Sequence, residues 1–136
     1  MIAIVDSFAW IELLAGSVHE ERVRETLTGA DVVVTPDLVL TEVARELARD
    51  GVGRSDICRK VMDISTLSEV ASITVEVALG VFEAETDLRR SAKTRQLNAP
   101  GLSDPVTLST ARARGGLVLT GDPHFERFRD TEWLGS

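Results

Sequence analysis

GLSDPVTLSTARARGGLVLTGDPHF, residues 101–125, places two carboxylates around a predicted helix and a predicted strand. Asp104 opens the helix, with Ser103 as the expected N-cap, and a Gly-Gly pair closes it. The short apolar run Leu117–Thr120 predicts a buried strand, and Asp122 follows its end. When a helix and the next strand lie antiparallel, the helix begins at the edge of the sheet where the strand ends. We therefore expect Asp104 and Asp122 to lie close together.

Length and composition predict a single domain over residues 1–136. A hydrophobic content of 43% is typical of a globular protein and excludes disorder. The N-terminus MIAIVDSFAW is unlike a signal peptide, and no apolar run approaches the roughly 20 residues that span a membrane. Cys58 is the only cysteine, so no internal disulfide is possible and we expect a cytoplasmic, reducing location.

The formal net charge of −7 argues against a nucleic-acid partner unless several carboxylates surround a divalent cation, which would neutralise them. Thirteen of the fifteen basic residues are arginine, whose planar guanidinium suits contacts with phosphate or carboxylate. The charge by itself leaves both possibilities open.

Apolar, β-branched runs alternate with segments of helical periodicity along the whole chain. This alternation predicts an α/β fold with three layers, α/β/α, around a mainly parallel, twisted sheet of four to five strands. An all-helical alternative leaves the runs IAIV, VVVT and LVLT without a place. The expected strands are residues 1–5, 31–34, 69–73, 117–120 and an edge strand at 132–134; the expected helices are residues 8–16, 18–28, 36–49, 55–64, 75–93 and 104–114.

Four acidic residues are predicted to meet at one edge of this sheet. Asp6 follows the first strand, Glu42 lies early in the helix after the second, and Asp104 and Asp122 flank the fourth. Right-handed crossovers bring these positions to the same edge. Clustered carboxylates repel one another, and a bound cation relieves that repulsion. Oxygen ligands favour Mg²⁺ or Mn²⁺.

Each acid also has an ordinary structural explanation. Asp6 could cap a helix, Glu42 could be a solvated helix residue, Asp104 could balance the helix dipole and Asp122 could belong to a turn. Their joint placement favours a shared metal site over four separate structural roles.

Around these acids the segments IVDSFAW, TEVARELA, LSDPVTLSTARARGG and LVLTGDPHF resemble the motifs of the PIN-domain ribonucleases. They are most similar to the single-domain VapC-type toxins of toxin–antitoxin pairs. The resemblance covers nearly the whole chain, and the last two segments are the most specific. It implies a PIN-like fold and a Mg²⁺- or Mn²⁺-dependent endoribonuclease that leaves a 5′-phosphate.

The resemblance also assigns roles to residues. It makes Asp6, Glu42, Asp104 and Asp122 the catalytic, metal-binding set. Ser7 and Thr120 match small hydroxyl positions that would hold a carboxylate or a metal-bound water in place.

VapC-type proteins typically dimerise and bind an antitoxin segment in the acidic groove, so a cognate antitoxin and a homodimer are expected. Leu13, Val43 and Leu47 are candidates for such a surface, although the sequence does not separate an exposed stripe from the core.

RNA contact is expected from basic residues that precede the helix of Asp104: Arg89, Arg90, Lys93 and Arg95. The alternative is that they only balance the C-terminal dipole of their own helix. Neither histidine has partners at zinc-like spacing. We expect His19 and His124 to be surface residues, with His124 near enough to Asp122 to touch substrate.

Other functions remain alternatives. A PIN nuclease of RNA processing has the same motifs as a toxin. An acidic α/β module without nuclease activity, similar to a phospho-receiver, needs an Asp after a middle strand, and the strand at 69–73 ends without one. A phosphatase of the Asp-nucleophile type needs a second Asp two residues after Asp6, where the chain has Phe8.

Overall fold

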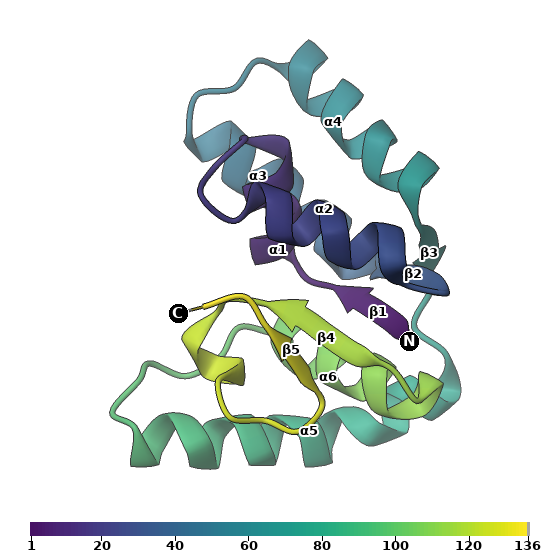
Figure 1. Cartoon of the computed structure of the whole chain (residues 1–136). Helices are drawn as coiled ribbons and strands as arrows, with labels where there is room; N and C mark the ends of the chain where they lie inside the picture. Colours follow the sequence, from purple (N-terminus) through teal and green to yellow (C-terminus); the bar gives the residue numbers. More distant parts are fainter. Residues whose placement is uncertain (136) are drawn as a thin grey trace.

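Five parallel strands form one sheet in the order β3-β2-β1-β4-β5 in the computed structural model, which describes residues 1–135 (Figure 1). Most buried side chains of the strands are apolar, as a sheet covered on both faces requires, and Thr35 and Thr120 are the buried polar ones among the described strands. The elements are β1 Ile2–Val5, α1 Ser7–Leu14, α2 Glu20–Gly29, β2 Val32–Pro36, α3 Asp37–Arg49, α4 Arg54–Leu67, β3 Glu69–Ala71, α5 Val75–Thr94, α6 Ser103–Arg114, β4 Leu117–Thr120, the 3₁₀ turn η1 Pro123–Phe125 and β5 Thr131–Trp133.

Two hydrophobic clusters, one on each face of the sheet, form the core. Alternation along β1 sends Ala3 and Val5 to the cluster of α1–α4, and Ile4 to the cluster of α5 and α6. Figure 1 shows these helix layers above and below the sheet. The expected α/β/α architecture is confirmed, and all the strand pairs are parallel.

The border between β2 and α3 differs from the prediction. Thr35 and Pro36 were expected to cap and begin the helix, but they pair with Val70 and Ala71 of β3. Pairing with a neighbouring strand, which a local pattern does not reveal, extends β2 to Pro36. At the other end of the chain, Gly115 adopts the left-handed conformation (φ 64°) and closes α6 as predicted.

Helix α5 divides its apolar residues between the core and the surface. Val77 and Leu88 are buried, whereas Leu79 and Phe82 are 78% and 79% exposed. Leu79 and Phe82 therefore lie on the exposed side of the helix, away from the face of Val77 and Leu88. On α3, the choice that the sequence left open is decided: Val43 and Leu47 lie in the core and cannot form part of a partner surface.

No helix among the described residues is both long enough and apolar enough to cross a bilayer. Cys58 is a free, exposed cysteine on α4.

Candidate active site

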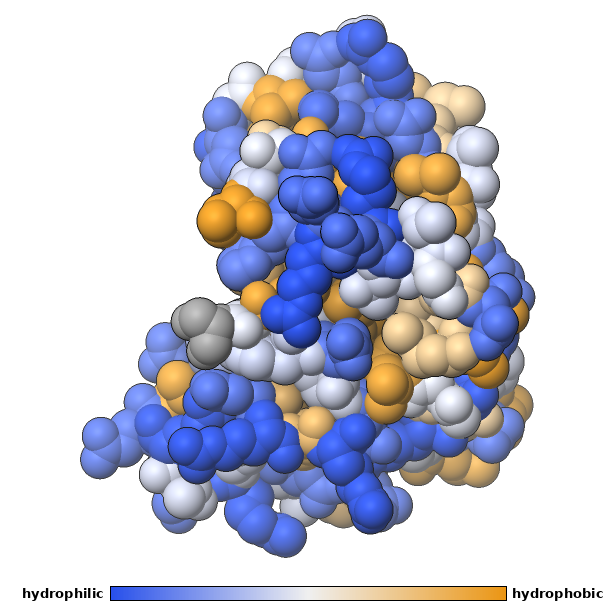
Figure 2. Space-filling model, viewed as in Figure 1, coloured by the Kyte–Doolittle hydropathy of each residue, from blue (hydrophilic) through white to orange (hydrophobic). Residues whose placement is uncertain are grey.

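The carboxyl ends of β1 and β4 form the centre of the site. The two strands are neighbours although 111 residues separate Val5, the end of β1, from Leu117, the start of β4, so the strand order reverses between them. Ligands of open α/β sheets bind at this switch point. Asp6 directly follows β1, and Asp122 lies two residues beyond β4. In Figure 1 both strands point to the left, and on that side the space-filling surface of Figure 2 is hollowed.

Asp6 is the most buried of the four acids, at 5% exposed. It is the N-cap of α1, and its Oδ1 accepts a hydrogen bond from the amide of Ala9 at 3.0 Å. Burial raises the pKa of Asp6 well above its ordinary value. The charges of Asp104 and Asp122 raise it further, against the lowering effect of hydrogen bonds from Thr120 and Ala9. The capping role considered for Asp6 is therefore real, but it leaves a buried carboxyl beside two other acids.

Asp104, in the first turn of α6, faces the same space. Burial raises the pKa of Asp104 to about 7, and the charges of Asp122 and Glu42 add to the shift. The charges of Asp104 and Asp122 therefore act on Asp6, and those of Asp122 and Glu42 act on Asp104. The structure brings together the four acids that the sequence predicted to share one edge.

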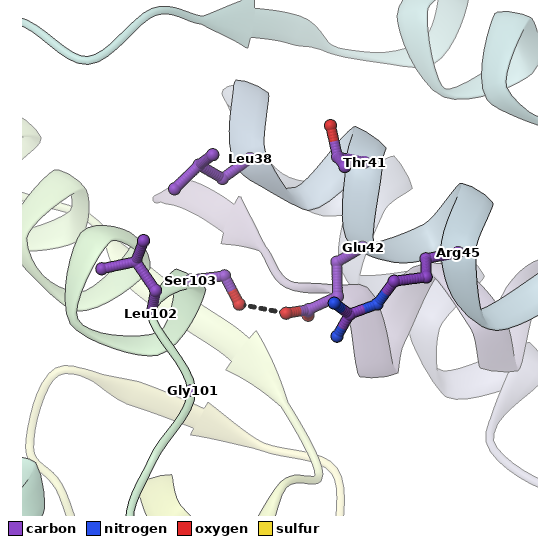
Figure 3. Close-up of a pocket in the computed structure, with 7 residues that line it drawn as sticks. All are labelled: Leu38, Thr41, Glu42, Arg45, Gly101, Leu102 and Ser103. Carbon is purple, nitrogen blue, oxygen red and sulfur yellow. Dashed lines mark hydrogen bonds between the residues drawn. The ribbon is translucent and has the colours of Figure 1, made fainter.

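Glu42 is held between two serine hydroxyls. Ser7 donates to its Oε1 and Ser103 to its Oε2. Figure 3 shows Glu42 of α3 and Ser103 of α6 pointing toward each other across a cavity of about 210 Å³ that Leu38, Arg45 and Leu102 also line. Glu42 is therefore not a freely solvated helix residue.

Ser103 has a different role from the predicted one. The N-cap of α6 is Leu102, which makes no capping hydrogen bond through its side chain. The Ser103 hydroxyl instead reaches 61 residues back along the chain to Glu42. Only the packing of α3 against α6 creates this contact, so a sequence pattern could not separate it from capping.

Thr120 lies between two acids. Its Oγ1 accepts a hydrogen bond from the amide of Asp122 at 2.9 Å, and its hydroxyl bonds the carboxyl of Asp6. Thr120 is completely buried, so these contacts are not exchanged for water.

His124, which the sequence placed at the surface close to Asp122, makes two hydrogen bonds through its ring. Its Nδ1 lies 2.8 Å from Oδ1 of Asp122, and its Nε2 lies 2.7 Å from the carbonyl oxygen of Asn98. Both partners are acceptors, and only the imidazolium has two N–H groups to donate. Burial lowers the pKa of His124, but the bonds to Asn98 and Asp122 outweigh it and raise the pKa. The signal in the sequence was the two-residue spacing from Asp122.

These side chains have the chemistry of a cation site. Asp104, Asp122 and His124 lie close together, with one side-chain atom of each within 4.8 Å of the others. Both ring nitrogens of His124 already have protein partners, so the carboxylates are the candidate ligands. Burial and mutual repulsion raise the pKa values of Asp6 and Asp104 in spite of His124, so the cluster favours a further positive charge. A divalent cation bound by carboxylate oxygens would supply it, so the residues present fit a metal ion.

Of the four predicted RNA-binding residues, two already have partners. Arg95 bonds the carbonyl oxygen of Pro123 at 2.5 Å and Oε2 of Glu126 at 2.6 Å. Arg89 pairs with Glu85 at 3.6 Å within α5. Arg90 and Lys93 are exposed and make no ion pair with any described residue.

The sequence model of the PIN domain family matches residues 3–130, nearly the whole chain. The chain belongs to the PIN domain family. None of the curated proteins compared with it matches significantly. The family consists of nucleases that generally use divalent metals, in agreement with the acidic cluster.

Solved structures share the fold of this PIN domain at low sequence identity. VapBC2 from Rickettsia felis, bound to a promoter DNA fragment, superposes with a TM-score of 0.70 at 15% identity, covering 98% of this chain and 97% of that one. A toxin–antitoxin complex from Klebsiella pneumoniae gives 0.71 at 17% identity, covering 97% of each chain. VapC20 from Mycobacterium tuberculosis, a toxin that cleaves the sarcin-ricin loop, gives 0.69 at 21%, covering 96% and 98%. The expected likeness to VapC-type proteins is confirmed at the level of the fold.

Proposed function

We propose that this PIN domain is a Mg²⁺- or Mn²⁺-dependent endoribonuclease and the toxin of a type II toxin–antitoxin pair. The observation that carries the proposal is the convergence of four acids at the switch point of the sheet, two of them with raised pKa values. An acidic cluster of this kind is costly to fold unless a cation binds it, which argues for a functional site.

Asp6, Glu42, Asp104 and Asp122 would hold the metal. When bound, the cation lowers the pKa of a water molecule and offsets charge at the phosphodiester. The serines beside Glu42 fix the direction of its carboxylate, and Thr120 fixes Asp6 and the backbone at Asp122. His124 holds Asp122 from the other side.

The toxin assignment rests on the similar structures, which come from toxin–antitoxin complexes and from a toxin that cleaves RNA. We infer that the partners are an RNA substrate and a cognate antitoxin, and that the location is the cytoplasm, where a lone exposed thiol such as Cys58 stays reduced.

We also infer a homodimer. Val75, Leu79 and Phe82, at i, i+4 and i+7 on α5, form an exposed apolar stripe that nothing in this chain covers among the described residues.

The purified chain tests the enzymatic proposal. We expect a labelled single-stranded RNA to be cut internally with Mg²⁺ or Mn²⁺, to give 5′-phosphate ends, and to stay intact with EDTA. Asp104→Asn should lower the rate at least about a thousandfold while the variant remains folded by circular dichroism. Cleavage by the chain that survives EDTA would contradict metal dependence. A wild-type chain that binds Mn²⁺ but cuts no RNA would favour the binding-module alternative instead.

A further inference from the structure

A second cavity, lined by arginines, lies beside the acidic site. It has a volume of about 470 Å³ and lies between the C-terminal half of α5 and the segment that follows η1. Arg90, Arg95, Arg127 and Phe128 line it. The surface over this region, at the lower left of Figure 2, is strongly hydrophilic.

The charge of this cavity is positive. Asp87 is the one acid in its lining, and Arg112 pairs with it at 2.9 Å. Arg95 is paired with Glu126. Arg90 and Arg127 are exposed and have no ion pair with any described residue. Two uncompensated guanidinium groups therefore face one cavity on a chain whose net charge is −7.

Arg127 occupies an unfavourable backbone conformation. Its φ is 74°, in the left-handed region that L residues other than Asn, Asp and Gly rarely adopt. The next residue, Phe128, packs edge-on against buried Phe125, with ring centroids 6.5 Å apart, and fixes the loop. Strained backbone conformations are concentrated at functional sites, so the conformation of Arg127 on this anchored loop indicates that its charged side chain has a functional position.

The cavity shares a wall with the acidic site. Arg95 bonds the carbonyl oxygen of Pro123, which directly follows Asp122. Three residues after Arg95, the Asn98 carbonyl accepts from His124. The segments 95–98 and 122–126 thus separate the two spaces, and a nucleic-acid strand leaving the acids on this side meets the arginines.

We propose that this cavity binds a backbone phosphate of the RNA strand next to the one that is cut, with Arg90 and Arg127 supplying the charge. The proposal rests on the proposed function. The acids by themselves repel a polyanion, so a neighbouring positive site is needed to hold the strand. Arginine suits this task because its planar group contacts phosphate through two N–H bonds. Of the residues predicted from sequence, only Arg90 contributes directly, and Arg127 is new.

A double variant, Arg90→Gln with Arg127→Gly, tests the proposal. Glycine accepts the positive φ at position 127, so the fold should be retained. We expect KM for RNA to rise about tenfold with kcat within twofold. The slope of log Kd against log salt should fall by about 0.7, as expected for the loss of one phosphate contact on a single strand.

Two matched controls accompany it. Arg89→Gln removes a neighbouring charge on α5 outside the cavity, where Arg89 pairs with Glu85. Gln96→Gly relieves the other positive φ of a non-glycine residue, 59°, without a charge change. Both should leave KM within twofold.

Several results would overturn the proposal: a KM change no larger than that of Arg89→Gln, a loss of kcat with KM unchanged, or a change in oligomeric state without loss of RNA affinity. If the wild-type chain cuts no RNA, the proposed function fails. The affinity of the wild type and the double variant for the same RNA, measured by fluorescence anisotropy with Ca²⁺, then decides this proposal separately. Weaker binding by the double variant supports it, and equal binding overturns it.

Discussion

At the scale of single residues, hydroxyl groups determine how the acids are held. Glu42 projects from a helix that contributes no other acid to the site, and two serines from two other helices fix it. Side chains that orient a metal-binding carboxylate typically contribute ten- to a hundredfold to activity or metal affinity. We therefore expect Ser103 to affect activity through the position of the Glu42 carboxylate.

We expect Ser103→Ala to lower RNA cleavage about tenfold, because Glu42 keeps only the hydrogen bond from Ser7. The free energy of unfolding should change by less than about 1.5 kcal/mol, the usual contribution of one hydrogen bond. Cleavage rates at several Mg²⁺ concentrations and denaturation by urea measure the two effects. Ser65→Ala is the control, since its hydroxyl bonds only the carbonyl of Val61 on exposed α4. Equal activity in the two variants would contradict the role of Ser103.

At the scale of elements, close packing at the junction between α6 and β4 restricts which side chains fit there. In the sequence, the Gly-Gly turn is expected to orient the helix against the strand and so to set the distance between Asp104 and Asp122. This interpretation predicts that a bulky residue at Gly116 lowers activity more than stability. The structure gives a different expectation. A Cβ at Gly116 would lie 2.6 Å from the backbone carbonyl oxygen of Ile2, at the start of β1.

Gly116→Ala should therefore destabilise the whole domain, by about 1–3 kcal/mol, because a backbone group has to move. Thermal denaturation of the metal-free protein measures this, and the remaining folded fraction should cleave RNA at nearly the normal rate. Gly29→Ala provides the comparison: no atom lies within 4 Å of the added Cβ, so stability should stay the same or rise. A stable Gly116→Ala protein with low activity would support the first expectation instead.

At the scale of the whole molecule, the acidic site opposes folding until a cation binds. The pKa values of Asp6 and Asp104 are higher in the folded chain than their ordinary value of 3.8. The folded state therefore holds more protons than the unfolded state between about pH 4 and pH 7. By linkage, the free energy of unfolding contributed by these two groups is largest below about pH 4. It decreases as the pH rises and is lost once the pH exceeds about 7, the folded pKa of Asp104.

We expect the Tm of the metal-free protein to be at least about 5 °C lower at pH 8 than at pH 5, with much of the difference removed by Asp104→Asn. Mg²⁺ should raise the Tm at pH 8, where the carboxylates are ionised, and have little effect at pH 5. Differential scanning fluorimetry with EDTA and with Mg²⁺ measures both. A Tm at pH 8 that does not respond to either Mg²⁺ or Mn²⁺ would argue against a cation site.

The exposed stripe of α5 gives a second prediction at this scale. Leu79→Glu with Phe82→Glu should convert the proposed dimer to a monomer and leave the core unaffected, since both side chains are largely exposed. Light scattering after size exclusion measures the mass. Met62→Glu on α4, also exposed, should remain dimeric. A wild-type chain that is monomeric at micromolar concentrations would show that no dimer forms.

The sequence by itself determined the order of helices and strands, the parallel sheet and the positions of Asp6, Glu42, Asp104 and Asp122. It could do so because apolar periodicity is a local property and because strand ends in a parallel sheet share an edge. The same reasoning accounts for the family motifs, which lie within these local segments.

The tertiary structure alone decided which groups surround the acids and which apolar residues are buried. Ser103 finds Glu42 across 61 residues, His124 joins Asp122 to Asn98, and Arg127 meets Arg90 across a cavity. In α5, Val77 is buried and Leu79 on the opposite face is exposed, and packing against the rest of the chain decides which of the two apolar faces is covered. These contacts depend on how distant elements pack. A local sequence pattern indicates several possible partners and environments for a residue, and the packing of distant elements decides which one it has.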